Sequence, residues 1–245
     1  MTTHTAETSP QVYARIGGVL YLMIIVLGTL GELFTLDRLI VSGDAVSTAN
    51  HIMASPSLWR IGIAGDLMMH VFDIPLMLVF YVLLKPVNKN LALLAVLFNL
   101  IQTAVLVTNT LNLLIPLFLL GNADYLKAFE PNQLYALTYL FVKLHDYGSD
   151  IGFIFFGFEC LALGYLIFKS NYLPRILGVL MQIAGLSYLT NSFTLLLAPS
   201  FASMIVPAIL VLAFLGETSL CLWLLVKGVN VRRWSERAAT EIATI

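Results

Sequence analysis

The sequence has few charged residues and few cysteines. Charged residues make up 11% of the 245-residue chain and hydrophobic residues 59%, whereas soluble domains carry about 25% charged residues. The formal net charge of −1 leaves no basic face for nucleic acid. Cys160 and Cys221 both lie in apolar runs, and no CxxC motif occurs. This cysteine usage argues against a disulfide framework or a cysteine metal site, and the sequence identifies no cofactor.

The N-terminal segment also lacks basic residues. MTTHTAETSPQ contains no Lys or Arg, and the apolar run after it is too long for the hydrophobic region of a signal peptide. We therefore expect residues 1–13 to form a mobile polar tail before a first helix that stays in the protein.

Long hydrophobic runs are what the chain has in abundance. A membrane-spanning helix needs about 20 mainly apolar residues, and six segments meet this requirement. The sequence predicts an all-α, polytopic membrane helix bundle, with a single transmembrane domain over 14–227 and a basic interfacial, then disordered, tail over 228–245. Pro131 is expected to start an interfacial helix that continues into the fourth span. The six predicted spans are approximately 14–35, 60–84, 91–119, 147–168, 174–198 and 204–226.

The distribution of Lys and Arg predicts the orientation of these spans, because cytoplasmic loops of membrane proteins are enriched in both residues. Nine of the 13 Lys and Arg residues fall on the side of the two termini, and four fall on the other side. We therefore expect both termini to be cytoplasmic in a multi-pass protein of the inner (plasma) membrane. The nine residues are Arg15, Lys85, Lys89, Lys169, Arg175, Lys227, Arg232, Arg233 and Arg237.

The predicted spans contain carboxyl groups but no Lys or Arg at comparable depth. Ionisable residues in spans are rare and usually face the interior of the bundle. A carboxyl group in an apolar interior has to be protonated, hydrated or neutralised by a cation. The residues concerned are Glu32, Asp66, Asp73, Asp150, Glu159 and Glu217, with His70 beside them.

Several of these residues are spaced so that they share helix faces. Asp66, His70 and Asp73 follow i, i+4, i+7 spacing, which places them on one stripe of the second span. Since charged faces turn toward the bundle, we expect an acidic pocket that opens to the outside. The residues predicted to line it are Glu32, Asp66, His70, Gln102, Asn109, Asn112, His145, Asp146 and Asp150.

Three carboxyl groups lie deeper and are the candidates for acid catalysis. Glu159 and Glu217 each lie ten residues before a Lys at the inner end of the span. This spacing puts them about 15 Å inside, near the midplane of a ~30 Å hydrocarbon core. Asp73 comes out about 18 Å from the inner end. A carboxyl group kept protonated there would serve an intramembrane enzyme acting on a lipid or isoprenoid, and the same groups would serve proton-linked transport or sensing.

Two further interpretations stay open. Asp66, His70, Glu32 and Asp150 lie at similar depth and carry ligands that suit zinc or manganese, although no HExxH spacing supports a metal site. Alternatively, neutral carboxyl and amide groups join helices by hydrogen bonds in a structural, accessory or sensory protein. The leading hypothesis is a pocket that handles a small hydrophobic or cationic molecule, a cation or protons, with the lipid bilayer as surroundings. The oligomeric state does not follow from the sequence.

Three stretches resemble a known family. They are FFGFECLALGYLIFKSNYLPRILGVLMQIAGLSYL (155–189), LLKPVNKNLALLAVLFNLIQ (83–102) and GETSLCLWLLVKGVNVRRW (216–234). The chain resembles, from Arg15 to about Arg237, the bacterial membrane proteins catalogued as domain of unknown function 4386. The resemblance implies a multi-helix membrane fold and carries no activity, so no site residue named above comes from it.

Overall fold

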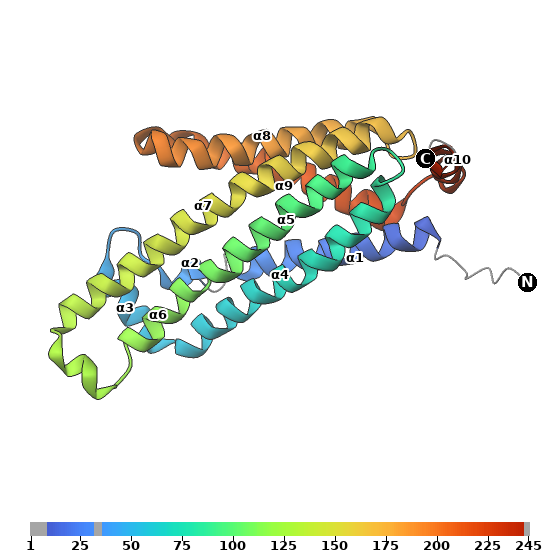
Figure 1. Ribbon diagram of the computed structural model, residues 1–245. Coiled ribbons are helices and arrows are strands. Elements are labelled where there is room, and N and C mark those ends of the chain that lie inside the picture. Colours follow the sequence, from blue (N-terminus) through green and yellow to red (C-terminus); the bar gives the residue numbers. More distant parts are fainter. Residues whose placement is uncertain (1–8, 32–35, 243–245) are drawn as a thin grey trace, which may run out of the picture. The chain divides into compact units, whose positions relative to one another are not determined.

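The computed structural model describes residues 9–31 and 36–242, with side chains except those at 37, 201–208, 241 and 242. This part of the chain is helical and contains no strand (Figure 1). The long elements are α1 (Pro10–Gly31), α4 (Pro56–Leu84), α5 (Lys89–Asn109), α7 (Pro131–Ser170), α8 (Arg175–Leu197) and α9 (Pro199–Val226). The short elements are α2 (Asp37–Leu39), α3 (Ala45–Ala54), α6 (Leu111–Leu119), the 3₁₀ helix η2 (Asp124–Ala128) and α10 (Val231–Ile242).

Six helical segments in the described chain are long and apolar enough to cross a membrane, as the sequence predicts. The third consists of α5 followed by α6, with Thr110 between them. The fourth is α7, which begins at Pro131 as expected and continues for 40 residues. At ~1.5 Å per residue α7 is about 60 Å long, roughly twice the thickness of a ~30 Å hydrocarbon core. Part of α7 therefore extends beyond the hydrocarbon region.

The chain divides into two compact units, which the long helices pass through. Unit 1 comprises Met1–Leu22, Phe72–Gln102 and Phe153–Ile245, and unit 2 comprises Met23–Val71 and Thr103–Gly152, in both cases as far as the residues are described. Unit 1 holds α8, α9 and α10, and unit 2 holds α2, α3 and α6. Each unit is described separately below.

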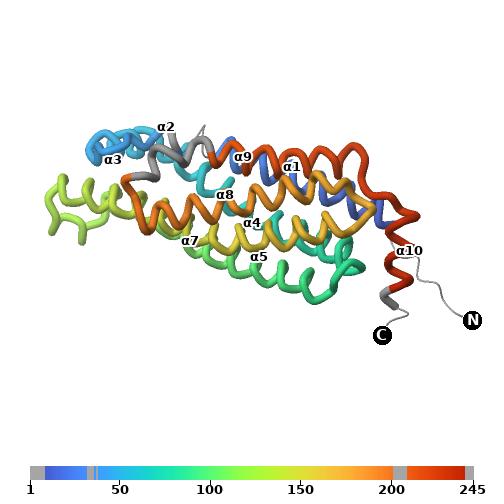
Figure 2. Tube along the Cα trace, turned by 90° about the horizontal axis from the view of Figure 1, so that it is seen from above, coloured from blue at the N-terminus to red at the C-terminus, as the bar shows by residue number. Residues whose placement is uncertain are grey.

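In unit 1, glycines let α7 and α8 approach closely. A Cβ atom on Gly178 would lie 2.6 Å from the carbonyl oxygen of Gly164, and one on Gly185 would lie 2.7 Å from that of Gly157. Small residues of this kind allow helix backbones to approach in membranes, where van der Waals packing holds helices together. On its other side α8 runs alongside α9 (Figure 2).

The start of α1 and the end of α9 are joined at one end of unit 1. Gln11 Nε2 donates to the carbonyl oxygen of Lys227 at 3.0 Å, and its Oε1 accepts from the backbone N–H of Val229 at 3.0 Å. Trp234 on α10 donates to the carbonyl oxygen of Leu83 at 3.0 Å. The sequence predicts disorder after the basic interfacial segment, whereas the described chain stays helical to Ile242. The hydrogen bond from Trp234 to Leu83 fixes α10 against the end of α4.

Unit 2 has its own apolar core around Trp59. The Trp59 side chain is fully buried, packs in a cluster with Ile52 and Val142, and donates to the carbonyl oxygen of Leu113 at 2.7 Å. Helices α3 and α6 contribute to this cluster, so α3, which lies between two predicted spans, packs into a core. Asp44 caps α3, since its Oδ1 accepts from the backbone N–H of Ser47 at 2.9 Å.

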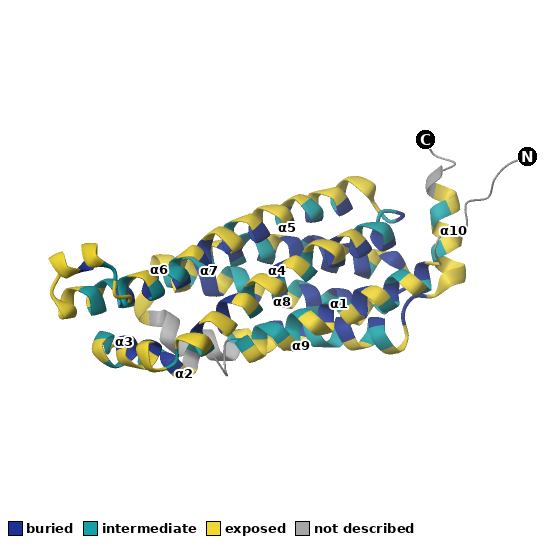
Figure 3. Ribbon diagram, turned by 90° about the horizontal axis from the view of Figure 1, so that it is seen from below, coloured by how far each residue is buried: buried dark blue, intermediate teal, exposed yellow. Residues whose placement is uncertain are grey.

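The outer helix surfaces are apolar. On α5, Leu93, Leu97 and Leu100 are each between 46% and 49% exposed and lie on one face, and exposed residues recur along α5 (Figure 3). Ala95 and Asn99 on the opposite face are buried. A helix that exposes its leucines and buries an asparagine suits lipid rather than water.

Candidate functional site

The polar side chains of unit 1 meet in a carboxyl cluster, which we define as Asp73, Glu159 and Glu217. The three groups come from α4, α7 and α9, respectively. Burial is nearly complete for Glu159, which is 3% exposed. The sequence proposes these three residues as the deep acids, and they lie in one unit.

One amide connects two members of the carboxyl cluster. Nδ2 of Asn99, on α5, donates to Asp73 Oδ2 at 2.9 Å and to Glu159 Oε2 at 3.2 Å. Asn99 is only 1% exposed, and its Oδ1 has no hydrogen-bond partner among the described atoms. An unpaired buried carbonyl oxygen carries a free-energy cost. The Asn99 side chain nevertheless adopts this orientation, in which its NH2 group points at both acids.

Two phenols bind the third member. Tyr188, on α8, donates to Oε1 of Glu217, and Tyr21, on α1, donates to Oε2 at 3.2 Å. The ring of Tyr188 is held against Phe156, with ring centroids 4.9 Å apart. Both carboxyl oxygens of Glu217 therefore accept a hydrogen bond from a neutral donor.

The three acids also act on one another through space. Glu159 interacts electrostatically with both Asp73 and Glu217, and Glu217 interacts with Asp73. The donors named above are an amide and two phenols, which are neutral and leave the total charge of the acids unchanged. Together with these donors, the carboxyl cluster draws one residue from each of the six spans.

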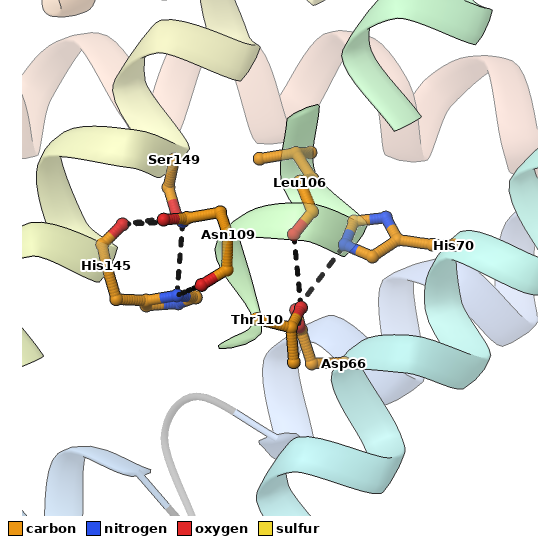
Figure 4. Close-up of polar contacts among 7 residues, drawn as sticks. All are labelled: Asp66, His70, Leu106, Asn109, Thr110, His145 and Ser149. Atoms are coloured by element: carbon orange, nitrogen blue, oxygen red, sulfur yellow. Dashed lines mark hydrogen bonds and ion pairs between the residues drawn. The ribbon is translucent and has the colours of Figure 1, made fainter. Parts of the chain in front are cut away.

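Unit 2 contains a second polar group of residues, around Asp66 and His70 (Figure 4). Asp66 Oδ1 lies 3.6 Å from Nε2 of His70, one turn further along α4. Its Oδ2 accepts from the hydroxyl of Thr110 at 2.7 Å. His70 is 3% exposed, and the side chain of Asp66 is 21% exposed. Thr110 therefore connects the junction of α5 and α6 to the Asp66–His70 pair by a hydrogen bond.

Asn109 forms the neighbouring polar contacts of unit 2. Its Nδ2 donates to the carbonyl oxygen of His145 at 2.8 Å and lies 3.1 Å from both His145 Nδ1 and Ser149 Oγ (Figure 4). Its Oδ1 accepts from Asn112 Nδ2 at 2.9 Å. Gly148 makes room for this amide, because a Cβ atom there would overlap Asn109 Oδ1. These contacts fasten α5 to α7.

The remaining residues that the sequence assigns to a pocket occupy different positions. Gln102 is buried in unit 1, and its Oε1 has no hydrogen-bond partner among the described atoms. Asp146 is 46% exposed and accepts from Lys143 at 2.9 Å, so it lies at the surface of α7. Asp150 lies half-buried on α7 in unit 2. Glu32 lies outside the described residues.

The residues that the sequence proposes as metal ligands provide only part of a donor set. Among the described residues, no three His, Cys, Asp or Glu side chains meet in an arrangement that would hold a metal ion. Asp66 and His70 provide one carboxylate and one imidazole, two ligands where structural and catalytic zinc sites use three or four from the protein. Of the other two proposed ligands, Asp150 does not complete such a group, and Glu32 is outside the described residues.

Sequence reasoning missed the donors of the carboxyl cluster. Asn99 carries a detectable signal, because it lies three residues before Gln102 on the face of α5 that also holds Ala92 and Ala95. Tyr21 and Tyr188 carry none, since tyrosines in spans occur commonly as interfacial or packing residues.

These features define a multi-pass, all-helical membrane protein with acids held among neutral hydrogen-bond donors. The family model described as "Domain of unknown function (DUF4386)" matches residues 16–228, and the chain belongs to that family. The chain is also similar to an "Uncharacterized protein" from Archaeoglobus fulgidus, to which it is 30% identical over 183 residues. The match covers 73% of this chain and 88% of the relative. No solved structure matches the chain.

Proposed function

We propose that the protein reversibly binds protons at the carboxyl cluster and couples this binding to the handling of a small molecule or cation in the membrane. The observation that carries the proposal is the shared environment of the three acids, which interact electrostatically while their named donors are all neutral. An uncompensated carboxylate is costly to bury. The carboxyl cluster can reduce its negative charge directly by binding a proton.

The positions of the donors support exchange of a proton within the cluster. Glu217 accepts from a phenol on each oxygen, and Asp73 and Glu159 both accept from the amide of Asn99. The three acids therefore have unequal environments, and pairs of acids with unequal environments divide the roles of proton donor and acceptor. We accordingly propose that a proton is exchanged among the three acids.

Burial favours proton handling over the rival function of intramembrane acid catalysis. A catalytic acid has to lie within hydrogen-bond reach of the substrate atom that it protonates. Glu159 is only 3% exposed and is bonded to Asn99. A proton can reach such a group through small motions or a water molecule, whereas a lipid or isoprenoid substrate needs an opening of its own size.

The orientation belongs to the same proposal. We place both termini in the cytoplasm and the protein in the inner (plasma) membrane, because nine of the 13 Lys and Arg residues fall on the side of the termini. The start of α1 and the end of α9 are bonded to one another through Gln11, which supports termini on one side and an even number of spans.

The test is an infrared titration of the purified full-length protein in lipid nanodiscs. Wild-type protein is expected to show a carboxylic-acid C=O band in the span interior that responds to pH, and Glu159→Gln, Asp73→Asn and Glu217→Gln should each change it. Glu236→Gln serves as the matched control, because Glu236 is 61% exposed on α10 and bonded to Arg232. A band that none of the three cluster variants alters would overturn the proposal.

Proteoliposomes then separate transport from catalysis. A proton-coupled protein is expected to acidify or alkalise the lumen when an imposed gradient and a transported cation are present, and Glu217→Gln should abolish this flux. If a pH-responsive band exists but no gradient-driven flux is found with inorganic cations or small organic amines, the coupling half of the proposal is wrong and proton binding alone remains.

A further inference from the structure

A basic cavity lies at one end of unit 1, away from the carboxyl cluster. It has a volume of about 520 Å³ and lies where the turn before α5, the end of α7, the start of α8 and the helix α10 come together. Its charged lining residues are Lys169, Arg175 and Arg237, with Asn88 and Asn171 between them. Among the described side chains, the lining contains no Asp or Glu. The cavity therefore concentrates three positive charges.

The three positively charged side chains are held in place by aromatic rings and a backbone carbonyl oxygen. Arg175 lies over the ring of Phe168, with 5.6 Å from Cζ to the centroid, and Lys169 Nζ lies 5.9 Å from the ring centroid of Tyr165. Arg237 Nε donates to the carbonyl oxygen of Pro86 at 3.3 Å. In the described part of the chain, none of the three cations pairs with a carboxylate. As far as the side chains are described, the charge is thus available to a ligand.

The helix that starts at the cavity adds to the positive potential. Arg175 is the first residue of α8, and no side chain caps this helix, because Pro174 stands at the N-cap. The first N–H groups of an α-helix have no partner within the helix, and the helix dipole is positive at this end. An anion at the start of α8 would receive both contributions.

The cavity lies at the ends of three predicted spans. Lys169 is the penultimate residue of the fourth span, Arg175 is the first residue of the fifth, and Asn88 immediately precedes the third. Tyr165 and Trp234 lie at the same end of the unit, bonded or stacked as described above. Aromatic residues of this kind mark the boundary between hydrocarbon and water.

We propose that this cavity binds the phosphate group of an anionic membrane phospholipid. Arginine presents paired N–H donors that match phosphate oxygens, and lysine adds a point charge. Basic pockets between membrane helices hold anionic headgroups in this manner. The acyl chains would lie along the apolar outer faces of α7 and α8, where Tyr165 and Ile176 are 44% and 61% exposed. A lipid is favoured over free phosphate because three span ends place the site at the headgroup layer.

Lipid retention in native mass spectrometry tests the site. The full-length protein is purified from nanodiscs containing phosphatidylglycerol and phosphatidylcholine, and the bound lipid is counted. Wild-type protein is expected to retain phosphatidylglycerol in preference to phosphatidylcholine. Arg237→Gln and Lys169→Gln should each weaken this retention about fivefold, since one charge near the surface is lost.

Arg232→Gln is the matched control on the same helix. Arg232 is 87% exposed, is bonded to Glu236 at 2.9 Å and does not line the cavity, so its loss should leave retention unchanged. Glu217→Gln should also leave it unchanged, which separates this site from the proposed proton site. Thermal unfolding in phosphatidylcholine verifies that each variant folds, and Arg237→Lys, which keeps the charge, should retain more lipid than Arg237→Gln.

Three outcomes would overturn the proposal. Equal retention of the two lipids would remove the requirement for an anionic headgroup. Equal weakening by Arg232→Gln and Arg237→Gln would show that general surface charge, not the cavity, attracts the lipid. Binding of inorganic phosphate that displaces the lipid and depends on Arg237 in the same way would assign the cavity to the free anion.

Discussion

Asn99 and Glu159 are joined by a hydrogen bond of 3.2 Å from Nδ2 to Oε2, although both side chains are almost completely buried. The same amide nitrogen donates to Asp73 at 2.9 Å. Asn99 is therefore an uncharged link between two acids on different helices.

Asn99→Ala is expected to lower the free energy of unfolding by about 1–2 kcal/mol, because the two carboxyl groups lose their shared donor. Thermal unfolding in a mild detergent measures the change. Asn132→Ala, at an exposed position near the start of α7, should leave stability unchanged. Equal shifts for the two variants would show that the amide of Asn99 contributes nothing specific.

Tyr188→Phe removes one donor from Glu217 and keeps the ring against Phe156. We expect a loss of about 1 kcal/mol of unfolding free energy in the wild-type background. The loss should be smaller in a Glu217→Gln background, because hydrogen bonds to an ionised acceptor are the stronger ones. The double-mutant cycle measures this difference.

Tyr125→Phe provides the control for the tyrosine series, since Tyr125 is 67% exposed. Its substitution should not change stability in either background. If Tyr188→Phe costs the same in the wild-type and Glu217→Gln backgrounds, the hydrogen bond does not depend on the charge of the carboxyl group.

Gly178→Ala is expected to destabilise unit 1, because the added methyl group would meet the carbonyl oxygen of Gly164 at 2.6 Å and force α7 and α8 apart. The expected loss is about 1–3 kcal/mol. Gly65→Ala is the matched control, since no atom apart from its chain neighbours and its own helix backbone lies within 4 Å of a Cβ there. It should be neutral, or stabilising by up to about 1 kcal/mol through helix propensity. Thermal unfolding of both variants shows whether the steric clash or the higher helix propensity of alanine determines the change in stability.

Thr110→Val removes the hydroxyl that donates to Asp66 at 2.7 Å. We expect a loss of about 1 kcal/mol and faster hydrogen exchange around the junction of α5 and α6. Thr108→Val is the control two residues away, because the exposed Thr108 hydroxyl bonds to the carbonyl oxygen of Ala104 on its own helix. Identical exchange in the two variants would contradict a specific role for the bond to Asp66.

The cap of α3 makes its stability depend on pH. The Ser47 hydroxyl, and after it the Ser47 backbone N–H, hold the pKa of Asp44 below its ordinary value. A lowered pKa in the folded state means that the cap stabilises α3 fully above the unfolded value of about 3.9. This contribution is lost as the pH falls through the lower folded value.

Hydrogen exchange of the α3 amides, corrected for intrinsic rates, measures this loss between about pH 6 and pH 3. Asp44→Asn keeps a capping side chain that does not titrate, so its protection should vary less over the same range. Parallel pH profiles for the two proteins would show that Asp44 does not set the response.

The hydrophobic pattern alone predicts the six spans, because a helix in lipid has to satisfy its backbone internally and expose apolar side chains over a defined length. Pro131 as the start of the fourth helix follows from the same local rules. The depth estimates also bring Glu159 and Glu217 to a common level, since both positions are counted along single helices.

The shared stripe of Asp66, His70 and Asp73 shows the limit of that reasoning. Spacing along α4 places the three residues on one face, but their partners come from other helices. Asp66 is bonded to Thr110, whereas Asp73 is bonded to Asn99. These pairings depend on how α5 is rotated and positioned against α4, which the sequence of α4 does not specify.

The amino-acid sequence by itself determined that the chain lies in a membrane as a set of helices and that its spans carry acids without bases, because both depend on composition and local periodicity. Only the tertiary structure decided which neutral donors those acids bind and that a basic cavity forms beside α10. Contacts of this kind join residues far apart in the chain, such as Tyr21 and Glu217, and they follow from how the helices pack.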